Sequence, residues 1–262
     1  MYQALYRKYR PKSFDDVVGQ KVIIKTLTNS IVNDKISHAY LFTGPRGTGK
    51  TSIAKILAKI VNCESLENTT PCNKCVSCTQ INNKQNTDII EIDAASNNGV
   101  DEIRELRDKV SLVPSFGKYK VYIIDEVHML TTAAFNALLK TLEEPPKHII
   151  FILATTEPHK IPSTILSRCQ RFDFKKISIN DIKIRLTYIC EQENINIDED
   201  SIELIGKLSD GGMRDSVSLL DQLTAYTTEK ITVSDVNDVY GTITEQEICE
   251  LLKLIFSNNR LG

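Results

Sequence analysis

The pattern of hydrophobic and polar positions predicts that strands and helices alternate in the first two thirds of the chain. Short, continuous apolar runs are typical of buried strands, and the segments between them carry apolar residues at a helical spacing. The predicted strands cover residues 39–43, 88–93, 120–126, 149–154 and 171–174. The predicted helices cover residues 21–33, 52–61, 100–110, 131–140 and 161–167. This alternation indicates an α/β domain with a parallel sheet.

The pattern changes near residue 177, after which only helices are predicted. Asn180 is expected to cap the first of them. The later helices are expected at residues 199–208, at 213–225, in a short unit from 233, and at 244–257. The chain is therefore expected to contain an α/β domain over residues 1–177 and a small all-helical domain over residues 178–241.

The composition suits two small domains. Of the 262 residues, 41% are hydrophobic and 25% are charged, which is enough apolar material for two cores. The net charge of −2 predicts no strong attraction of the chain as a whole to nucleic acid. No apolar stretch approaches the length of a membrane span, and the first ten residues lack the apolar core of a signal peptide. We therefore expect a cytoplasmic protein with no membrane partner, whose seven cysteines are reduced thiols or metal ligands.

The first predicted strand leads directly into a glycine-rich motif. Its residues, which match the pattern G-x-x-x-x-G-K-[ST], are Gly44, Pro45, Arg46, Gly47, Thr48, Gly49, Lys50 and Thr51. Glycines let the backbone curl so that its N–H groups point at phosphate oxygens, and the following helix adds the positive end of its dipole. Lys50 would reach the β- and γ-phosphates, and the Thr51 hydroxyl would ligate Mg²⁺. The motif therefore predicts a nucleoside triphosphate site.

Two further groups of polar residues follow later strands. Asp125 and Glu126 end the strand over residues 120–126, at the sheet edge where ligands bind in open α/β folds. Asp125 is predicted to hold Mg²⁺, and Glu126 to orient and deprotonate an attacking water. Thr155 and Thr156 follow the next strand. A hydroxyl there would hold this water or contact the γ-phosphate, and the alternative is a threonine that only caps a turn.

Four of the cysteines lie close together in a polar segment over about residues 62–80. They are spaced C-x8-C-x2-C-x2-C, at Cys63, Cys72, Cys75 and Cys78. Such a segment has no core of its own, and a tetrahedral Zn²⁺ held by four thiolates would stabilise its fold. A ferredoxin-type iron–sulfur site shares the C-x2-C-x2-C run but requires a C-x3-C-P partner that is missing from this sequence. We therefore predict a structural zinc site.

Taken together, these motifs resemble those of the gamma/tau subunits of bacterial DNA polymerase III, the motor subunits of the sliding-clamp loader. The general superfamily is the AAA+ ATPases, and the cysteine segment and Ser167-Arg168-Cys169 narrow the resemblance to clamp loaders. The other motifs that carry it are Tyr9-Arg10-Pro11, Val18-Gly19-Gln20, Asp93-Ala94-Ala95-Ser96, Ile123-Ile124-Asp125-Glu126-Val127-His128, Leu153-Ala154-Thr155-Thr156 and Gly212-Met213-Arg214-Asp215. The resemblance covers essentially the whole chain.

The resemblance implies a fold and a domain order. The fold is an AAA+ P-loop ATPase domain with a parallel sheet and a zinc-binding insertion, followed by a small all-helical lid domain. Residues 242–262 would be the first helix of a collar domain that continues beyond this sequence. The enzyme implied is an ATPase that uses ATP and Mg²⁺ and has no polymerase chemistry of its own. Arg10 and Val18 would join the phosphate loop in contacting the nucleotide.

The resemblance also implies roles for single residues. Thr156 would be the sensor-1 group, with Thr155 as the alternative. Arg214 would be sensor 2 and would contact the γ-phosphate in its own subunit. Arg168 would be the arginine finger that reaches the ATP of a neighbouring subunit, where a guanidinium suits charge spread over several oxygens.

The partners implied are other clamp-loader subunits (delta, delta prime and further gamma/tau copies), the sliding clamp and primer–template DNA. Relatives contact the DNA from the helix after Ala95-Ser96; Arg104 fits that pattern, but Asn98-Gly99 departs from relatives with a basic residue there. The implied function is to open the clamp and load it onto primed DNA during replication. Two other interpretations are a different AAA+ remodeller, which would lack the cysteine segment, and a non-hydrolysing scaffold subunit, which would lack Lys50.

Overall fold

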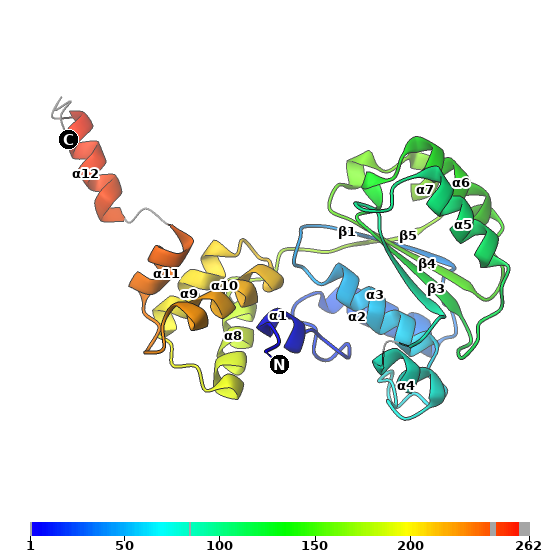
Figure 1. The fold of residues 1–262 in the computed structure, drawn as a ribbon, viewed down its shortest axis with the longest axis horizontal. Helices are drawn as coiled ribbons and strands as arrows, with labels where there is room; N and C mark the ends of the chain where they lie inside the picture. Colours follow the sequence, from blue (N-terminus) through cyan, green and yellow to red (C-terminus); the bar gives the residue numbers. More distant parts are fainter. Residues whose placement is uncertain (1, 84, 242–244, 257–262) are drawn as a thin grey trace. The chain divides into compact units, whose positions relative to one another are not determined.

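The chain is seen here in a computed structural model, and it divides into two compact units. The described residues are 2–83, 85–241 and 245–256. The α/β unit consists of residues 10–177, and the helical unit consists of residues 178–262 together with residues 1–9. Figure 1 shows strands with their helices in the first unit and helices alone in the second.

Residues 2–9 pack with the helical unit, whereas the sequence pattern predicts them as part of the α/β domain. Leu5 of helix α1 (Leu5–Lys8) is buried, and α1 packs against helix α10 (Met213–Tyr226). Asp221 of α10 accepts hydrogen bonds from the Leu5 backbone N–H at 3.3 Å and from the Tyr2 hydroxyl at 2.5 Å. A buried leucine and a carboxylate therefore attach this segment to the helical unit.

The α/β unit is built on one five-stranded, fully parallel sheet, which confirms the predicted fold class. The strands are β1 (Ala39–Thr43), β2 (Ile89–Asp93), β3 (Lys120–Asp125), β4 (Ile149–Thr155) and β5 (Gln170–Asp173). Their order in the sheet is β2-β3-β4-β1-β5. This order places the carboxyl ends of β3, β4 and β1 side by side, so the residues that follow these three strands share one edge.

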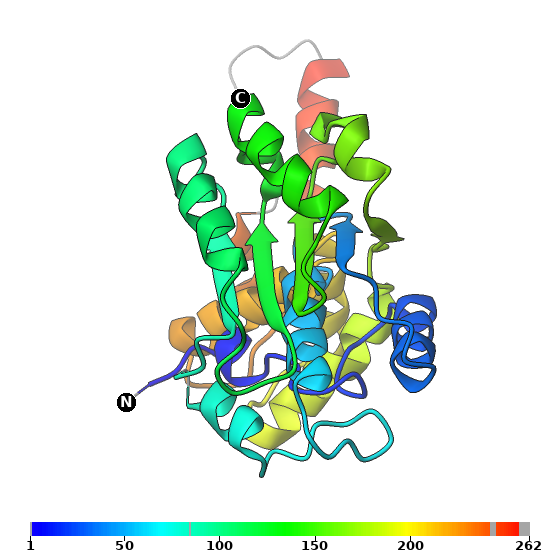
Figure 2. The ribbon, with the colours of Figure 1, turned by 90° about the vertical axis from the view of Figure 1, so that its right-hand side faces the viewer.

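Helices cover both faces of the sheet (Figures 1 and 2), which explains why the central strands are buried along nearly their whole length. The two faces of the sheet belong to two hydrophobic cores. Successive residues of β1 point to opposite faces, so Tyr40 and Phe42 belong to one core and Ala39 and Leu41 to the other. The helices of the first core are α2 (Lys21–Val32) and α3 (Lys50–Val61), and those of the second are α5 (Val100–Val110), α6 (Thr132–Glu143) and α7 (Ser163–Leu166).

The cysteine segment lies between α3 and β2 and contains a helix that the sequence pattern does not predict. This helix, α4 (Val76–Asn82), packs against α3. Lys59 of α3 is buried, and its ammonium group donates hydrogen bonds to the side-chain oxygens of Asn73 at 2.5 Å and Asn82 at 2.7 Å. Lys59 thereby attaches the cysteine segment to the helix that begins at the phosphate loop.

In the described part of the helical unit, α1 and α10 pack together with α8 (Ile179–Glu193), α9 (Glu199–Leu208) and α11 (Val233–Tyr240). Helix α8 begins after Ser178, whose hydroxyl accepts a hydrogen bond from the Asp181 backbone N–H at 3.1 Å. The prediction that Asn180 caps this helix is therefore wrong. Asn180 lies inside the first turn, and Ser178 has the usual N-cap geometry.

The last described helix is α12 (Glu245–Phe256), and the side chains of Ile255 and Phe256 near its end are exposed. The expected collar segment over residues 242–262 extends outside the described residues at 242–244 and 257–262. Within the described ranges, no helix combines the length and the apolar character that a membrane crossing needs.

Candidate functional site

The phosphate loop follows β1 and leads into α3, in the strand–loop–helix order that the motif requires. Gly44 has a φ of +136°, and a Cβ atom there would lie 2.3 Å from the Phe174 carbonyl oxygen. Gly47 and Gly49 also have positive φ angles, of +75° and +101°. Side chains other than that of glycine are strained in these conformations, so the glycines of the motif set the path of the loop.

Lys50 is the first residue of α3, and its side chain is buried. Its ammonium group donates hydrogen bonds to the carbonyl oxygens of Gly44 at 2.7 Å and Pro45 at 2.8 Å. Burial lowers the pKa of Lys50, and the carboxylates of Glu126 and Asp125 act in the opposite direction. A cation is therefore held at the loop near two carboxylates, where phosphate oxygens can replace the carbonyl oxygens as its partners.

The sequence-predicted magnesium ligands, Thr51 and Asp125, lie in contact although 74 positions separate them in the chain. The Thr51 hydroxyl donates a hydrogen bond to Asp125 Oδ2 at 2.7 Å. Thr51 lies in the first turn of α3, and Asp125 is the last residue of β3. A hydroxyl and a carboxylate are hard oxygen donors, the type that Mg²⁺ prefers. The donor set therefore fits the predicted ion.

Glu126 is positioned by its backbone conformation and by Thr156. It has a φ of +47°, which is uncommon for a residue other than glycine, and it precedes the short 3-10 helix η1 (Val127–Met129). Its Oε2 atom accepts hydrogen bonds from the Thr156 backbone N–H at 3.2 Å and from the Thr156 hydroxyl at 3.0 Å. Thr156 follows β4, so the candidate base and the candidate sensor 1 meet at the ends of neighbouring strands.

The adjacent Thr155 has different partners. It is fully buried, and its hydroxyl oxygen lies 3.0 Å from His128 Nδ1 and accepts a hydrogen bond from the Glu157 backbone N–H at 3.0 Å. The geometry therefore supports Thr156, rather than Thr155, as the hydroxyl beside Glu126. Contact of either threonine with a nucleotide stays a prediction.

His128 belongs to this cluster, although no role for it follows from the sequence alone. Only 7% of its side chain is exposed, and it lies between Glu126 and Glu157. Its Nδ1 atom is 3.3 Å from Glu126 Oε2, and its Nε2 atom is 3.6 Å from Glu157 Oε1. The signal in the sequence was a histidine two residues after Glu126, and the burial that gives it meaning arises only in the fold.

The segment before α2 also approaches the phosphate loop and its helix. Arg10 Nε donates a hydrogen bond to the hydroxyl of Ser52, in the first turn of α3, at 3.3 Å. Gln20, two residues after Val18, donates a hydrogen bond from its side-chain amide to the Thr48 carbonyl oxygen at 3.4 Å. The short motifs that contain Arg10 and Val18 therefore lie at the loop. Their contact with a nucleotide stays a prediction.

Arg168 lies at the opposite edge of the sheet from the phosphate loop. It precedes β5, whose first residue, Gln170, pairs with Tyr40 near the start of β1, whereas the loop follows the end of β1. Its guanidinium group donates hydrogen bonds to the Thr164 carbonyl oxygen at 2.6 Å and to the Glu143 carboxylate at 2.5 Å. The structure therefore does not bring Arg168 to the phosphate loop of its own chain.

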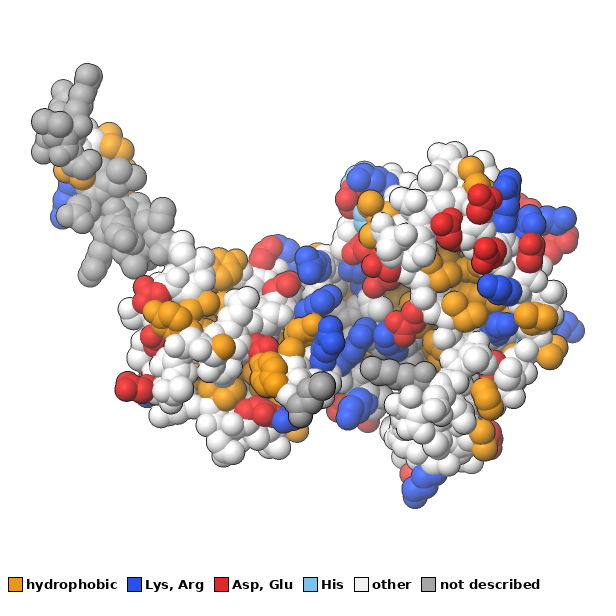
Figure 3. Space-filling model, viewed as in Figure 1, with side chains coloured by type: hydrophobic (Ala, Val, Ile, Leu, Met, Phe, Trp, Pro, Cys, Tyr) orange, Lys and Arg blue, Asp and Glu red, His pale blue; other side chains and the backbone are white. Residues whose placement is uncertain are grey.

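Two other predicted arginines have local partners. Arg214 belongs to the helical unit, where its guanidinium lies 5.1 Å from the centroid of the Tyr6 ring. Arg104 lies on α5 and forms an ion pair with Asp101 at 3.0 Å. Figure 3 shows acidic and basic side chains intermingled over α5. The proposed contacts of Arg214 with a γ-phosphate and of Arg104 with DNA stay predictions.

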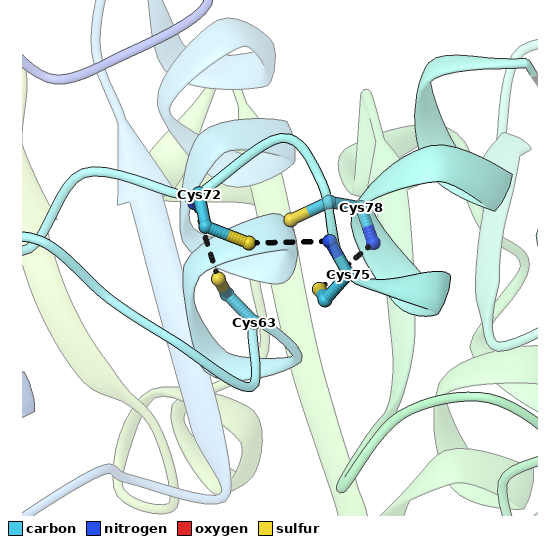
Figure 4. Close-up of side chains that lie close together, drawn as sticks. All are labelled: Cys63, Cys72, Cys75 and Cys78. Carbon is cyan, nitrogen blue, oxygen red and sulfur yellow. Dashed lines mark hydrogen bonds between the residues drawn. The ribbon is translucent and has the colours of Figure 1, made fainter.

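The four cysteines of the insertion converge, and their sulfur atoms all lie within 4.8 Å of one another. Figure 4 shows the side chains of Cys63, Cys72, Cys75 and Cys78 facing one another. Backbone N–H groups donate to three of the sulfurs: Cys72 to Cys63 at 3.3 Å, Cys75 to Cys72 at 3.3 Å, and Cys78 to Cys75 at 3.4 Å. Such N–H···S hydrogen bonds favour the thiolate form of the accepting sulfur.

This set of donors fits zinc. Four thiolates at the usual Zn–S distance of about 2.3 Å lie about 3.8 Å apart in a tetrahedron, inside the observed limit of 4.8 Å. Backbone hydrogen bonds from Lys74 and Cys75 lower the pKa of Cys72 to about 6, whereas burial raises the pKa of Cys63 and of Cys78. A bound cation would supply the charge that keeps these last two sulfurs deprotonated.

Two protein-family models match the chain. The model described as "DNA polymerase III, delta subunit" matches residues 19–178. The model described as "DNA polymerase III clamp loader subunit, ATPase lid domain" matches residues 181–229. The first match covers most of the α/β unit, and the second covers helices of the helical unit.

Curated relatives match almost the whole chain. DNA polymerase III subunit tau of Bacillus subtilis (strain 168) is 58% identical over 98% of this chain and 46% of that protein. The tau subunit of Escherichia coli (strain K12) is 45% identical over 98% of this chain and 40% of that protein. DNA polymerase III subunit gamma of Buchnera aphidicola subsp. Schizaphis graminum is 44% identical over 98% of this chain and 71% of that protein. The chain therefore spans less than half the length of these two tau subunits.

Solved structures share the fold at low sequence identity. The Thermotoga maritima RuvB Holliday junction branch migration motor superposes with a TM-score of 0.64 and 22% identity, over 97% of this chain and 81% of that chain. At this identity the similarity shows the fold alone. Together with the lid-domain match, it confirms an α/β P-loop ATPase fold followed by a helical lid domain.

Proposed function

The chain belongs to the gamma/tau family of bacterial DNA polymerase III subunits, and we propose that it is the ATP-hydrolysing motor of a clamp loader. The motor would open the sliding clamp and load it onto primed DNA during replication. The observation that carries this proposal is the convergence of five residues at one edge of the sheet: Lys50, Thr51, Asp125, Glu126 and Thr156. ATP hydrolysis needs a phosphate counter-ion, magnesium ligands and a residue that orients water in one place.

Each residue of the cluster has a chemical role in this proposal. Lys50 and the N–H groups of the loop would bind the β- and γ-phosphates. Thr51 and Asp125 would hold Mg²⁺, which neutralises phosphate charge when it is bound. Glu126 would orient the attacking water and accept its proton. Thr156 would hold the Glu126 carboxylate and contact the same water.

We place Arg168 in the nucleotide site of a neighbouring subunit. It lies at the sheet edge opposite its own phosphate loop, so a finger at this position would serve another molecule. The neighbours in this proposal are delta, delta prime and further gamma/tau subunits, and the sliding clamp and primer–template DNA are the other partners. Arg214 would act as sensor 2 in its own subunit, and Arg10 and Val18 would contact the bound nucleotide.

Two substitutions in the full-length subunit test the site. Lys50→Ala is expected to abolish ATP affinity, because the phosphates lose their counter-ion. Glu126→Gln is expected to keep ATP bound and to stop turnover, because it removes the base and leaves Thr51 and Asp125 intact. Nucleotide binding and ATP hydrolysis are measured with the partner subunits, the clamp and primed DNA. Equal loss of binding in both variants would show that Glu126 is misassigned.

We also propose that the cysteine cluster holds a structural Zn²⁺. Four thiolate ligands complete a tetrahedral shell, which is typical of structural rather than catalytic zinc sites. Elemental analysis of the protein, purified under reducing conditions, is expected to give about one zinc per chain. Iron in place of zinc, or no metal, would refute this assignment.

A further inference from the structure

The buried histidine beside Glu126 connects the candidate base to the end of β4. Nδ1 of His128 lies 3.0 Å from the Thr155 hydroxyl oxygen and 3.3 Å from Glu126 Oε2. Its Nε2 lies 3.6 Å from a carboxylate oxygen of Glu157. Because only 7% of the side chain is exposed, bulk water cannot readily replace these contacts. One imidazole thus joins residues that follow or end two neighbouring strands.

These contacts favour a proton on Nδ1. The ionised carboxylate of Glu126 can only accept, and a lone pair on Nδ1 at 3.3 Å would repel it. The Thr155 hydroxyl oxygen accepts the Glu157 backbone N–H and retains a second lone pair. A proton on Nδ1 is therefore attracted by two oxygens, at 3.0 and 3.3 Å. A proton on Nε2 would face only the Glu157 carboxylate oxygen, at the longer distance of 3.6 Å, and would leave the Glu126 carboxylate facing a lone pair on Nδ1.

We propose that His128 is a positioning residue for Glu126, an inference that rests on the proposed role of Glu126 as the base. The Nδ1–H of His128 and the backbone N–H and hydroxyl of Thr156 all approach the same oxygen, Oε2. With Oε2 held in this way, the other oxygen, Oε1, is left to receive the proton of the attacking water. The support matters because Glu126 has a left-handed backbone conformation that is unfavourable by itself.

The test uses the full-length subunit in the assembled clamp loader and separates kcat from ATP affinity. His128→Ala is expected to lower kcat by roughly 10- to 100-fold, the scale on which a displacement of about 1 Å in an active site acts. ATP affinity is expected to stay nearly constant, because Lys50 and the phosphate loop are intact.

Two amide substitutions distinguish a hydrogen-bond donor from a space-filling side chain. His128→Asn is expected to restore most of the rate, because its amide N–H₂ can take the place of Nδ1–H. His128→Gln, whose amide reaches the place of Nε2, is expected to restore little. Because both variants fill the buried site with an amide, their comparison remains decisive even where His128→Ala does not fold. Equal rescue by the two amides would overturn the proposal, and so would an unchanged kcat in His128→Ala.

His159 provides a matched control. Its side chain is 72% exposed, and its Nε2 atom lies 3.6 Å from the same residue, Glu157, that faces His128. His159→Ala is expected to leave kcat unchanged, and a loss equal to that of His128→Ala would overturn the specific role of His128. Glu126→Gln is measured in parallel. Full turnover in Glu126→Gln would refute the proposed function itself. Lost turnover in Glu126→Gln together with normal turnover in His128→Ala would refute only the positioning role of His128.

Discussion

The two edges of the parallel sheet differ in how their functional residues are held. At the carboxyl edge, side chains that end or follow different strands contact one another: Thr51 contacts Asp125, and Thr156 contacts Glu126. At the amino edge, Arg168 is held by a carbonyl oxygen of the preceding turn and by one exposed carboxylate. The carboxyl edge has the groups that a hydrolysis site needs, whereas the function of Arg168 depends on what faces it.

The difference follows from the direction of the strands. In a parallel sheet, every residue that follows a strand lies at the carboxyl edge, and every residue that precedes one lies at the amino edge. Arg168 precedes β5, so the length of β1 separates it from the phosphate loop of its own chain. Under the proposed function, one chain would carry parts of two nucleotide sites, and each site would be completed at a boundary between neighbouring subunits.

Arg168→Ala is expected to have the largest effect, because it should leave ATP affinity at the carboxyl edge intact and still stop hydrolysis in the assembled loader. ATP affinity of the isolated full-length subunit should be nearly unchanged, because its own loop does not use Arg168. Hydrolysis by the assembled loader should fall by roughly 10³-fold or more, as for other arginine fingers in phosphoryl transfer. The measurements are nucleotide titration of the subunit and steady-state ATPase activity of the loader with primed DNA.

A mixing experiment tests whether the site is shared. Arg168→Ala subunits contain an intact phosphate loop, and Lys50→Ala subunits contain an intact arginine. In loaders that contain both kinds of subunit, some boundaries pair the intact phosphate loop with the intact arginine, so activity is expected to recover in part. Absence of recovery at every mixing ratio, in loaders that are shown to assemble, would contradict the shared site.

The sequence predicts an element of the fold where a run of residues is buried without interruption. It does not predict an element whose formation depends on residues elsewhere in the chain. The apolar run at residues 149–154 became β4 because both faces of that strand are covered. Helix α4 was missed because its cap is the thiol of Cys75, which accepts the Cys78 backbone N–H, and few of its residues are apolar. The wrong cap at Asn180 arose because Ser178, two residues earlier, was equally suited by type.

The residues of the candidate site also differ in how far the sequence predicts them. Lys50 and Thr51 could be predicted because one short motif contains the strand, the loop and the helix. The contact between Glu126 and Thr156 could not, because it joins strands whose order the sequence does not state. The proposed role of Arg168 came only from the family resemblance, since the phosphate that it would contact belongs to another subunit and its own chain offers only the local partners Glu143 and Thr164.

Gly44→Ala tests whether the carboxyl edge depends on backbone geometry rather than on side chains alone. The new Cβ atom would lie 2.3 Å from the Phe174 carbonyl oxygen, at a φ of +136°. Backbone strain of about 1–3 kcal/mol and a steric cost of similar size are expected to weaken ATP binding by more than about tenfold and to lower the melting temperature.

Gly49→Ala is the matched control for this variant. Gly49 also has a positive φ, of +101°, but its added Cβ atom would have no heavy atom within 4 Å. It should therefore show the backbone strain without the steric clash, and a smaller loss of stability. Equal losses in the two variants would show that the close approach to Phe174 is unimportant.

Glu143→Gln is expected to have a small effect at the amino edge. The Glu143 side chain, which forms an ion pair with Arg168, is 49% exposed, and exposed ion pairs contribute about 0–1 kcal/mol to stability. The Thr164 carbonyl oxygen still accepts from the guanidinium, so hydrolysis by the assembled loader should fall by no more than about fivefold. The adjacent, exposed Glu144 supplies the control, Glu144→Gln. A loss as large as that of Arg168→Ala would mean that Glu143 itself takes part in the neighbour's site.

The smallest expected effect concerns Asp173, at the carboxyl end of β5. Its carboxylate accepts hydrogen bonds from the Thr43 hydroxyl and from Arg171 Nε, and these two contacts, the first above all, lower the pKa of Asp173. Because the folded state has the lower pKa, the stabilisation is fully present above about pH 4 and is lost as the pH falls through the folded-state pKa. Asp173→Asn should therefore lower the melting temperature by only a few degrees near neutral pH, and should flatten its decline below about pH 4. Melting curves of the full-length subunit across this pH range measure both quantities. An unchanged acid dependence in the variant would show that the hydrogen bonds of the Asp173 carboxylate do not stabilise the fold.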